Sequence, residues 1–423
     1  MLNVGLIGCG VISNLNVLGY IYSKDAEVVA IADTDLDNAK KKLERWSLRI
    51  CNVYKDYQEM IQKEDLDIVE ILTPHHLHYR MVKDCAEAGV PAISVQKPMA
   101  HTISDCENMI NVCNENDVKL KVFENFIFAP HIQEAKRLLD DGIIGERLNF
   151  RINTILTAGP HMPYSLLKSY LWRVQVDKCG GGPLVYDDGI HKFSLALWLM
   201  NQERVEQVYA WIDYFSGIMD GPANIIWKYP VKNKEPPKFG SMEFSLAPNL
   251  YFPSNYYACE EFVEISGTKG IMWINQCTSG GNFLSDSPHY PPIAVFSDGE
   301  VKTYGEDLPM DWRYSFINST EQFIEAVRED KKPIYTGEQG KNLSVFAKMP
   351  YISNQDKRKV NWDEISPMGE ASNSCIVEEF FTKRSSIFRM LKYNYRVAKD
   401  LKKGKKLGLK HTDFDYEHCY EEK

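Results

Sequence analysis

Residues 3–13 have the sequence NVGLIGCGVIS, and this stretch decides the fold of the chain. Its apolar first half predicts a buried strand, and Gly8 and Gly10 allow a tight turn whose backbone approaches a diphosphate closely. The helix expected from Asn14 to Tyr22 would point its N-terminal amides at the phosphate charge. A strand, a glycine turn and a helix in this order predict a dinucleotide site. The turn residues expected at the cofactor are Gly8, Cys9, Gly10, Val11 and Ile12.

An acidic residue after the next apolar run indicates which dinucleotide binds. Asp33 follows the run from Val28 to Ala32 and lies 20 residues after Ser13. At that distance its carboxylate can accept hydrogen bonds from the ribose hydroxyls of the adenosine. Thr34, beside it, carries no charge for a 2′-phosphate. The sequence therefore predicts NAD in preference to NADP, with Asp33 and Thr34 at the ribose.

The composition is that of a globular protein with small-molecule partners. At 423 residues the chain is too long for one ordinary core, so two domains and a tail are expected. A net charge of −9 argues against nucleic acid or an anionic membrane as the main partner. No apolar run is long enough to span a bilayer, and no charged, apolar leader follows Met1, so we expect a cytoplasmic protein.

The cysteines support the same location. Ten of them are scattered from Cys9 to Cys419 without a C-x-x-C pair. Zinc sites and disulfide frameworks are recognised by characteristic cysteine spacings, which this chain lacks. We therefore expect reduced, mostly buried thiols.

From Val4 to about Val122, short β-branched runs alternate with helical stretches, as in parallel βαβ units. These units predict an α/β fold in which residues 1–124 form an NAD-binding Rossmann domain. Ligands of such sheets lie beyond the carboxyl ends of the strands, so the residues that follow each run are candidates for the site. The candidates are Thr73, Pro74, His75, His78, Gln96, Lys97, Glu124 and Asn125.

Beyond residue 125 extended, aromatic and polar stretches dominate. They predict a second domain over residues 125–360, of the α+β type, with an open and mainly antiparallel sheet. Residues 361–423 form a C-terminal extension, in which apolar residues recur at helical spacing before a basic and then an acidic run. Because opposite charges follow each other at once, we interpret the extension as a packed helix with a solvated tail.

A second informative stretch, residues 180–191, has the sequence GGGPLVYDDGIH and leads into an apolar helix. If that helix begins near Leu184, Asp187 and His191 lie four residues apart on one face. The carboxylate would then hold the imidazole in one tautomer, as a general base requires. A structural histidine beside a helix-end carboxylate is the competing interpretation. Lys97 favours the catalytic interpretation, because it follows a strand at the same sheet edge as the glycine turn. Taken alone, it could equally be a lysine in a surface loop.

Together these motifs resemble the glucose–fructose oxidoreductase, inositol dehydrogenase and rhizopine-catabolism (Gfo/Idh/MocA) family. The resemblance runs from Asn3 to about Ser353. It implies a Rossmann domain followed by an open antiparallel sheet that often forms the subunit interface, and hence a homo-oligomer. The motifs that carry it are Gly8–Ser13, Thr73-Pro74 with His78, Gln96-Lys97-Pro98, Trp172-Arg173 and Gly180–His191.

The resemblance also implies roles for single residues. Lys97, Asp187 and His191 match the family's catalytic positions, Asn125 a position near the nicotinamide, and Arg173 one near the cofactor or substrate. When a secondary alcohol is oxidised, neutral His191 would take the hydroxyl proton while Lys97 stabilises the developing alkoxide. NAD would take the hydride, Asp187 would orient His191, and no metal is required because the lysine supplies the positive charge.

Three residues depart from the family pattern. Gln96 stands where the family usually has Glu, so tuning of Lys97 by an adjacent carboxylate is absent. His75 replaces a common Asn, and Ser194 stands where many members have Asp three residues after the histidine.

Extra aromatic residues favour a substrate larger than a simple polyol. They lie between Ala247 and Cys259, where they could stack on a sugar or aryl group or belong to a tyrosine-rich core or subunit interface. We expect a sugar or glycoside that bears a bulky group and is oxidised at a ring hydroxyl, with the third carbon of a glucoside as the favoured position. The aromatic residues are Tyr251, Phe252, Tyr256 and Tyr257.

Other functions remain open. One is a glycoside hydrolase that keeps NAD bound and uses transient oxidation of the ring to eliminate the aglycone. Another is an inositol or polyol dehydrogenase, and a third is a non-catalytic NAD-binding sensor, against which the intact Lys97, Asp187 and His191 argue. Net NADH and a keto-sugar would indicate a dehydrogenase, whereas free sugar without net NADH would indicate the hydrolase.

Overall fold

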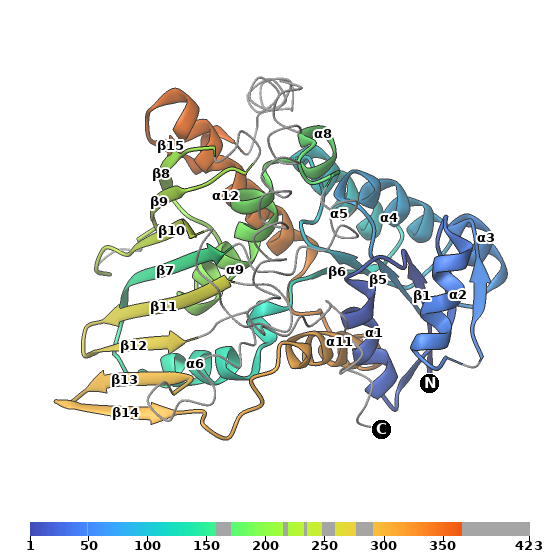
Figure 1. The fold of residues 1–423 in the computed structure, drawn as a ribbon, viewed down its shortest axis with the longest axis horizontal. Coiled ribbons are helices and arrows are strands. Elements are labelled where there is room, and N and C mark those ends of the chain that lie inside the picture. The colour runs from blue at the N-terminus through green and yellow to red at the C-terminus, as the bar shows by residue number, and fades with distance from the viewer. Residues whose placement is uncertain are drawn as a thin grey trace, which may run out of the picture.

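The computed structural model places two sheets on opposite sides of the molecule (Figure 1). Three predictions lie outside the described residues: the four aromatic residues from Tyr251 to Tyr257, most of the loop expected from Ser279 to Pro292, and the helix and tail of the C-terminal extension. The described residues are 1–48, 50–157, 171–214, 219–231, 235–247, 259–275 and 291–365.

The first sheet has six parallel strands in the order β3-β2-β1-β4-β5-β6. This order belongs to doubly wound dinucleotide-binding folds, so the predicted Rossmann domain is confirmed. The central strands β4 and β5 are buried along their whole length because the sheet is covered on both faces. The strands are β1 (Leu2–Ile7), β2 (Ala26–Ala32), β3 (Asn52–Tyr54), β4 (Ile68–Ile71), β5 (Ala92–Gln96) and β6 (Lys119–Phe123).

Three of the helices between these strands, α2, α3 and α5, begin at short polar side chains that cap them. Asp35, Asp56 and Thr102 each accept a hydrogen bond from a backbone amide in the first turn of the helix that follows. No side chain caps the helix after the glycine turn. The helices are α1 (Ser13–Tyr22), α2 (Leu36–Arg45), α3 (Tyr57–Lys63), α4 (His78–Glu87) and α5 (Ile103–Glu115).

The second sheet has nine strands in the order β14-β13-β12-β11-β7-β10-β9-β8-β15. Only β7 and β10 run parallel among the neighbouring strands of this sheet in the described chain, so the predicted open, mainly antiparallel sheet is confirmed. The strands are β7 (Arg147–Thr157), β8 (Gln207–Ile212), β9 (Ala223–Lys228), β10 (Phe239–Ala247), β11 (Cys259–Gly267), β12 (Gly270–Asn275), β13 (Ile293–Ser297), β14 (Glu300–Tyr304) and β15 (Val360–Asn361).

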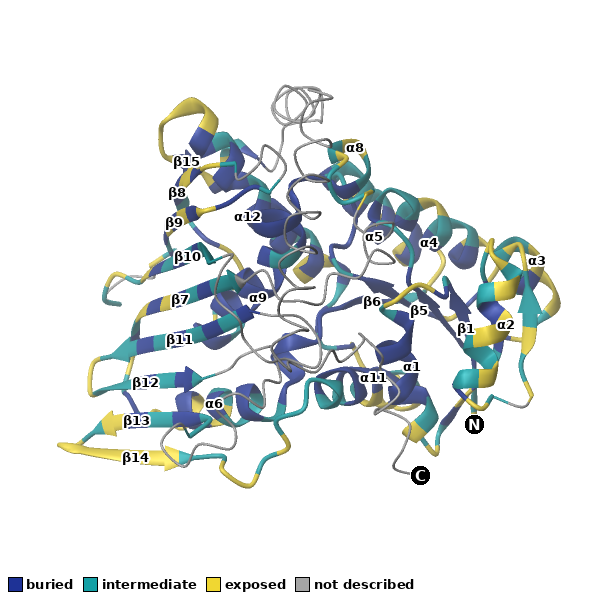
Figure 2. Ribbon diagram, viewed as in Figure 1, coloured by how far each residue is buried: buried dark blue, intermediate teal, exposed yellow. Residues whose placement is uncertain are grey.

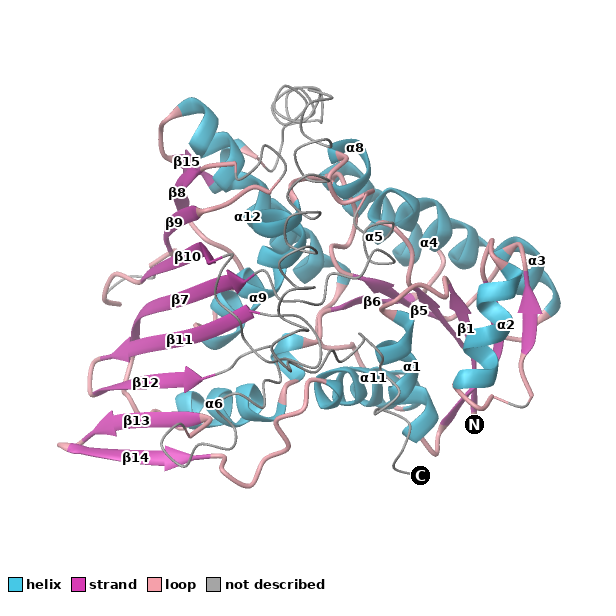
Figure 3. Cartoon of the chain, viewed as in Figure 1, coloured by secondary structure: helices cyan, strands magenta, loops and turns pink. Residues whose placement is uncertain are grey.

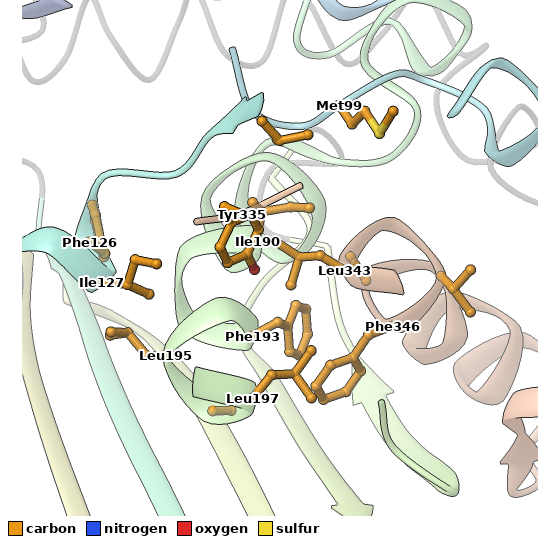
Figure 4. Packing of buried hydrophobic residues seen from close by; sticks show 14 of the residues in the cluster. Met99, Phe126, Ile127, Ile190, Phe193, Leu195, Leu197, Tyr335, Leu343 and Phe346 are labelled. Atoms are coloured by element: carbon orange, nitrogen blue, oxygen red, sulfur yellow. The ribbon is translucent and has the colours of Figure 1, made fainter. Parts of the chain in front are cut away.

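One face of the second sheet is buried beneath helices and the other is exposed (Figure 2; helices and strands are distinguished in Figure 3). The covering helices are α6 (Pro130–Asp140), α9 (Gly189–Leu199) and α12 (Gly337–Asp356). Phe193 of α9 and Phe346 of α12 lie side by side (Figure 4), with their ring centroids 4.3 Å apart. Both rings also contact Trp227 of β9. The same hydrophobic cluster continues to Val95 and Val122 of the first sheet, so one core joins the two domains.

A late segment of the chain returns to the Rossmann domain. Helix α11 (Arg313–Arg328) lies against α1 (Figure 1). The two helices approach closely because α1 has Gly19 at the contact, where a Cβ would come within 2.3 Å of Thr320. Residues far beyond the predicted domain boundary therefore cover one face of the first sheet. None of the helices in the described ranges has the length and apolar character needed to cross a membrane.

We predict that Gly19→Val lowers the free energy of unfolding by about 1–3 kcal/mol, because the larger side chain overpacks the contact between α1 and α11. Equilibrium denaturation by urea measures the change. Adding Thr320→Ala should recover part of the loss, since it removes Oγ1 and Cγ2, two of the three Thr320 atoms that a Cβ at position 19 meets. Equal stability of Gly19→Val and the natural protein would contradict the packing described for this pair.

Candidate active site

The glycine turn after β1 is shaped by the backbone around it. Gly8 has φ +100°, and a Cβ there would come within 2.8 Å of the Leu72 carbonyl oxygen, so glycine is required. Gly10 is different, because a Cβ there would meet no protein atom within 4 Å. Its bare backbone is therefore not explained by packing within the described chain and suits close approach by a ligand. The uncapped first turn of α1 follows directly, as a diphosphate site needs.

Asp33 lies at the carboxyl end of β2, next to this turn. Its Oδ2 accepts a hydrogen bond from the Cys9 amide at 2.7 Å, and its Oδ1 accepts one from the Asp35 amide at 2.8 Å. Each oxygen keeps a further lone pair, so the carboxylate can still accept hydrogen bonds from ribose hydroxyls. The turn and Asp33 fit the adenosine half of NAD.

Two strand-end candidates, His78 and Asn125, support the turns from within. His78 is fully buried, and its ring nitrogens lie 3.0 Å from the Met99 carbonyl and 2.7 Å from the Thr73 carbonyl. Burial lowers the pKa of His78 to about 3, so the ring is neutral. Because it does not reach the surface, we assign His78 the bracing of the turn at Thr73 and Pro74 in place of the direct cofactor contact expected from the sequence. Asn125 is also buried and donates to Ser315 Oγ at 2.8 Å.

Asp187 is the centre of the charged part of the site. Its carboxylate lies 3.2 Å from Lys97 Nζ, 2.6 Å from Arg173 Nε and 3.4 Å from His75 Nε2. Lys97 Nζ also donates to the Asp187 backbone carbonyl at 2.9 Å. Burial alone would raise the pKa of Asp187, but Lys97, Arg173 and His75 hold it well below its usual range. Three residues predicted for the site therefore converge on a fourth.

His191 is held by a different carboxylate. Its Nδ1 lies 2.9 and 2.8 Å from the two oxygens of Glu124, and its ring stacks on Phe126 with centroids 3.8 Å apart. Burial lowers the pKa of His191, although Glu124 acts in the opposite direction. The neutral ring donates through Nδ1 to Glu124, which leaves Nε2, unbonded to any described side chain, to accept a proton.

The predicted pairing of Asp187 with His191 is therefore wrong. It assumed an α-helix from Leu184, but Pro183–Asp188 is a π-helix (η3), in which the Asp187 amide donates to the Gly182 carbonyl, and α9 begins only at Gly189. Asp187 and His191 therefore belong to two different helical segments, and each has its own partners. Asp187 contacts Lys97 and Arg173, whereas His191 contacts Glu124.

Glu124 is the functional candidate that sequence analysis underrated. It was noted among the strand-end residues without a role, because nothing local shows which distant histidine it meets. The Glu124 carboxylate is fully buried and also accepts the Phe126 amide at 2.7 Å. Burial would raise the pKa of Glu124, but His191 and that amide keep it below its usual range. An acidic residue at the end of β6 was the available signal.

Two buried polar groups fix the segment that carries Asp187 and His191. Asp220 accepts the Leu184 and Val185 amides at 2.8 Å each and the Tyr351 hydroxyl at 2.5 Å. A Cβ at Gly182 would lie 2.1 Å from the Asp220 carboxyl carbon, which explains that glycine. The position of the segment is thus set by the second domain.

Further along α9, Lys192 is fully buried and pairs with Asp188 at 2.7 Å and with Glu261 of β11, which ties the helix to the sheet. Ser194, three residues after His191, donates to the His191 carbonyl at 2.8 Å. It therefore supports the turn of α9 that carries the histidine.

The fold and this site define an NAD-binding oxidoreductase. Residues 2–124 match the family model described as "Oxidoreductase family, NAD-binding Rossmann fold", and residues 132–272 match the GFO/IDH/MocA C-terminal domain. The chain belongs to the Gfo/Idh/MocA oxidoreductase family, as its motifs predicted.

The names of similar proteins refer to several different sugars and polyols. The chain is 37% identical to D-apiose dehydrogenase of Paraburkholderia graminis over 150 residues, which are 34% of this chain and 39% of that protein. It is 24% identical to myo-inositol 2-dehydrogenase of Thermotoga maritima over 86% of this chain and 99% of that one. It is 25% identical to 2,7-anhydro-N-acetylneuraminate hydratase of Mediterraneibacter gnavus over 84% and 95%.

Solved structures share the fold. An oxidoreductase from Agrobacterium radiobacter, in complex with NAD+, L-tartaric acid and magnesium, superposes with a TM-score of 0.71 at 21% identity. The match covers 86% of this chain and 99% of that one. The architecture described above is therefore that of known members in both domains.

We predict that Glu124→Gln lowers the pKa of His191 further, because the burial that depresses it remains while the anion that opposes it is gone. Titration of the ring signals by NMR, with His191→Gln used for assignment, measures this directly. His101, which pairs with Asp105 instead, is the internal control. In the oxidation reaction the acidic limb of the pH profile should move to lower pH, with turnover reduced about 10-fold or more. An unchanged His191 titration would contradict the pairing.

Proposed function

We propose that the protein oxidises a secondary alcohol on the ring of a sugar or glycoside with NAD. The observation that carries the proposal is the meeting of two residue pairs, Lys97 with Asp187 and His191 with Glu124, at the edge of the sheet that carries the glycine turn. Each pair joins one residue of the Rossmann domain to one near the start of α9. Sugar dehydrogenases among the relatives support the substrate class.

His191 is the proposed general base. Its Nε2 takes the proton from the substrate hydroxyl, and the positive charge that the ring gains is stabilised by Glu124 at Nδ1. Phe126 stacks on the ring and holds its plane, so the direction of Nε2 is fixed before substrate binds.

Lys97 is the proposed electrostatic group. Its ammonium stabilises negative charge on the substrate oxygen as the proton leaves, and Asp187 holds that ammonium in place through two contacts. Arg173, partly exposed and stacked on Trp172, stands beside the same carboxylate and is proposed to contact cofactor or substrate. In the reverse direction the same groups return the proton.

The residues of the site fit NAD. Residues 8–12 would hold the diphosphate and Asp33 with Thr34 the ribose, while the ends of β4 to β6 would line the nicotinamide half. Bound NAD supplies the hydride acceptor. We further propose the division expected from the sequence, with residues 1–124 for the cofactor, 125–360 for substrate and 361–423 as an extension. The cytoplasmic location stays a prediction.

The exposed face of the second sheet is proposed to bind a second copy of the chain. Large apolar side chains stand on it although they face solvent in the single chain, and such patches mark interaction sites. We expect sedimentation velocity to show a dimer or larger assembly, and a purely monomeric protein would contradict this. The residues are Trp211, Ile226, Phe239, Phe296 and Val301.

A second candidate reaction uses the same hydride site without net oxidation. The similarity to 2,7-anhydro-N-acetylneuraminate hydratase over most of both chains favours it. In such a reaction transient oxidation would acidify a ring C–H, a group would be eliminated, and the hydride would return. A glucoside oxidised at its third carbon is the finer substrate proposal for the dehydrogenase, and a glycoside with a bulky aglycone suits both reactions.

The test is a panel of free sugars, inositols and aryl glucosides mixed with protein and NAD, followed by NADH absorbance and product analysis. We predict NADH and a keto-sugar from one class of compound. Lys97→Ala should reduce that turnover by about 10²-fold or more while NAD binding persists, because the lost charge acts on the alkoxide. Lys83→Ala, a surface lysine paired with Glu87, is the matched control.

Free sugar without net NADH would replace the dehydrogenase by the elimination reaction. Turnover that is equal in Lys97→Ala and Lys83→Ala would contradict the role given to Lys97. No reaction of any kind across the panel, with NAD bound, would contradict the substrate class.

A further inference from the structure

A line of buried polar side chains runs from the middle of the Rossmann sheet to the backbone of Lys97. Its inner end is Glu70, the third residue of β4, which is fully buried between β1 and β5. A carboxylate in this position has lost its hydration, so the protein must supply hydrogen-bond donors in place of water.

The donors come from α1. Asn16 Nδ2 lies 2.5 Å from Glu70 Oε1, and the Tyr20 hydroxyl, one helical turn further on, also hydrogen-bonds the carboxylate. Burial raises the pKa of Glu70 to about 7, so above that pH the carboxyl group is ionised and only accepts hydrogen bonds. Asn16 then presents its amide nitrogen to Glu70 and its oxygen to the other side. That oxygen accepts from Gln96 Nε2 at 3.3 Å.

The direction of these hydrogen bonds continues to Lys97. Gln96 gives its nitrogen to Asn16, so its Oε1 accepts the Lys97 backbone N–H at 2.9 Å. The side chain of Lys97 in turn holds Asp187. Three hydrogen bonds of fixed polarity thus connect a carboxylate inside the sheet with the backbone of the lysine in the site.

We propose that Glu70 is a positioning residue for Lys97, acting through Asn16 and Gln96. This proposal rests on the proposed function in one respect, which is the catalytic role of Lys97. A glutamate at position 96 would face the Asn16 oxygen with a second acceptor, or would force that oxygen toward Glu70. Glu70, Asn16, Gln96 and the Lys97 backbone thus form a hydrogen-bond relay. Position 96 carries an amide because the carboxylate of this relay is at position 70.

The proposal predicts a reciprocal rescue. Gln96→Glu alone places a carboxylate on each side of the Asn16 side-chain amide. The amide nitrogen can face only one of them, so the relay should break. Adding Glu70→Gln should restore it, because Asn16 can turn round, donate to the new carboxylate and accept from the new amide. Glu70→Gln alone should have a small effect, since its amide oxygen still accepts from Asn16.

Hydrogen exchange of the Lys97 backbone amide is the readout that requires no substrate. It is measured on the full chain at pH 8 with single-residue resolution, and the Val95 amide serves as the reference. Gln96→Glu should reduce protection at Lys97 by about 10-fold, and the double variant should return to within about 3-fold of the natural protein. Ser94→Ala, which alters a buried neighbour paired with Glu70 across β4 and β5, should leave Lys97 protected.

Unchanged protection in Gln96→Glu, a double variant no better than the single one, or a loss in Ser94→Ala would each overturn the proposal. If Gln96→Glu does not fold, Asn16→Asp replaces it, because a carboxylate at 16 clashes with Glu70 and is relieved by Glu70→Gln. Since exchange is read without turnover, failure of the compound panel would contradict the proposed function alone. With an active compound, kcat should follow the same order among the variants.

Discussion

The buried carboxylate of Asp187 is the constraint on which the site depends. An ionised group in this environment is stable only while its partners stay in place, and removal of one partner of a buried pair costs about 3–5 kcal/mol. Lys97 and Arg173 therefore occupy defined positions because Asp187 requires them. Asp187 itself is placed by the π-helix after Gly182, which Asp220 and Tyr351 anchor to the second domain.

The two carboxylates of the site hold different residues and come from different domains. Asp187, from the segment before α9, faces a lysine of the Rossmann domain, whereas Glu124, from the end of β6, faces a histidine of α9. Each pair crosses between the domains, and the hydrophobic core beneath them is continuous. Any relative movement of the domains would separate both pairs at once, so the geometry for proton and hydride transfer is kept by the fold as a whole.

Sequence predicted the parts of the fold that rest on local patterns. The glycine turn, Asp33 and the strand ends were found because a short motif and its spacing carry the physical reason. Strand β14 has no buried face to produce an alternating pattern, and β3 is three residues long, so neither was expected. The predicted Asp187–His191 pairing was wrong because both residues have distant partners, Lys97 and Glu124, that local spacing does not reveal. The contact of Gly19 with Thr320 joins residues 301 positions apart, a distance that sequence periodicity does not address.

The central claim is that Lys97 and His191 face the same substrate hydroxyl from their two separate pairs. A crystal structure of the protein with NAD tests it most directly. The account predicts that the nicotinamide lies over the ends of β4 to β6, with its C4 facing a position about 3–4 Å from both Lys97 Nζ and His191 Nε2, where a substrate hydroxyl fits. A nicotinamide ring directed away from these two atoms, or a His191 ring that leaves Glu124 to bond Asp187, would contradict the account.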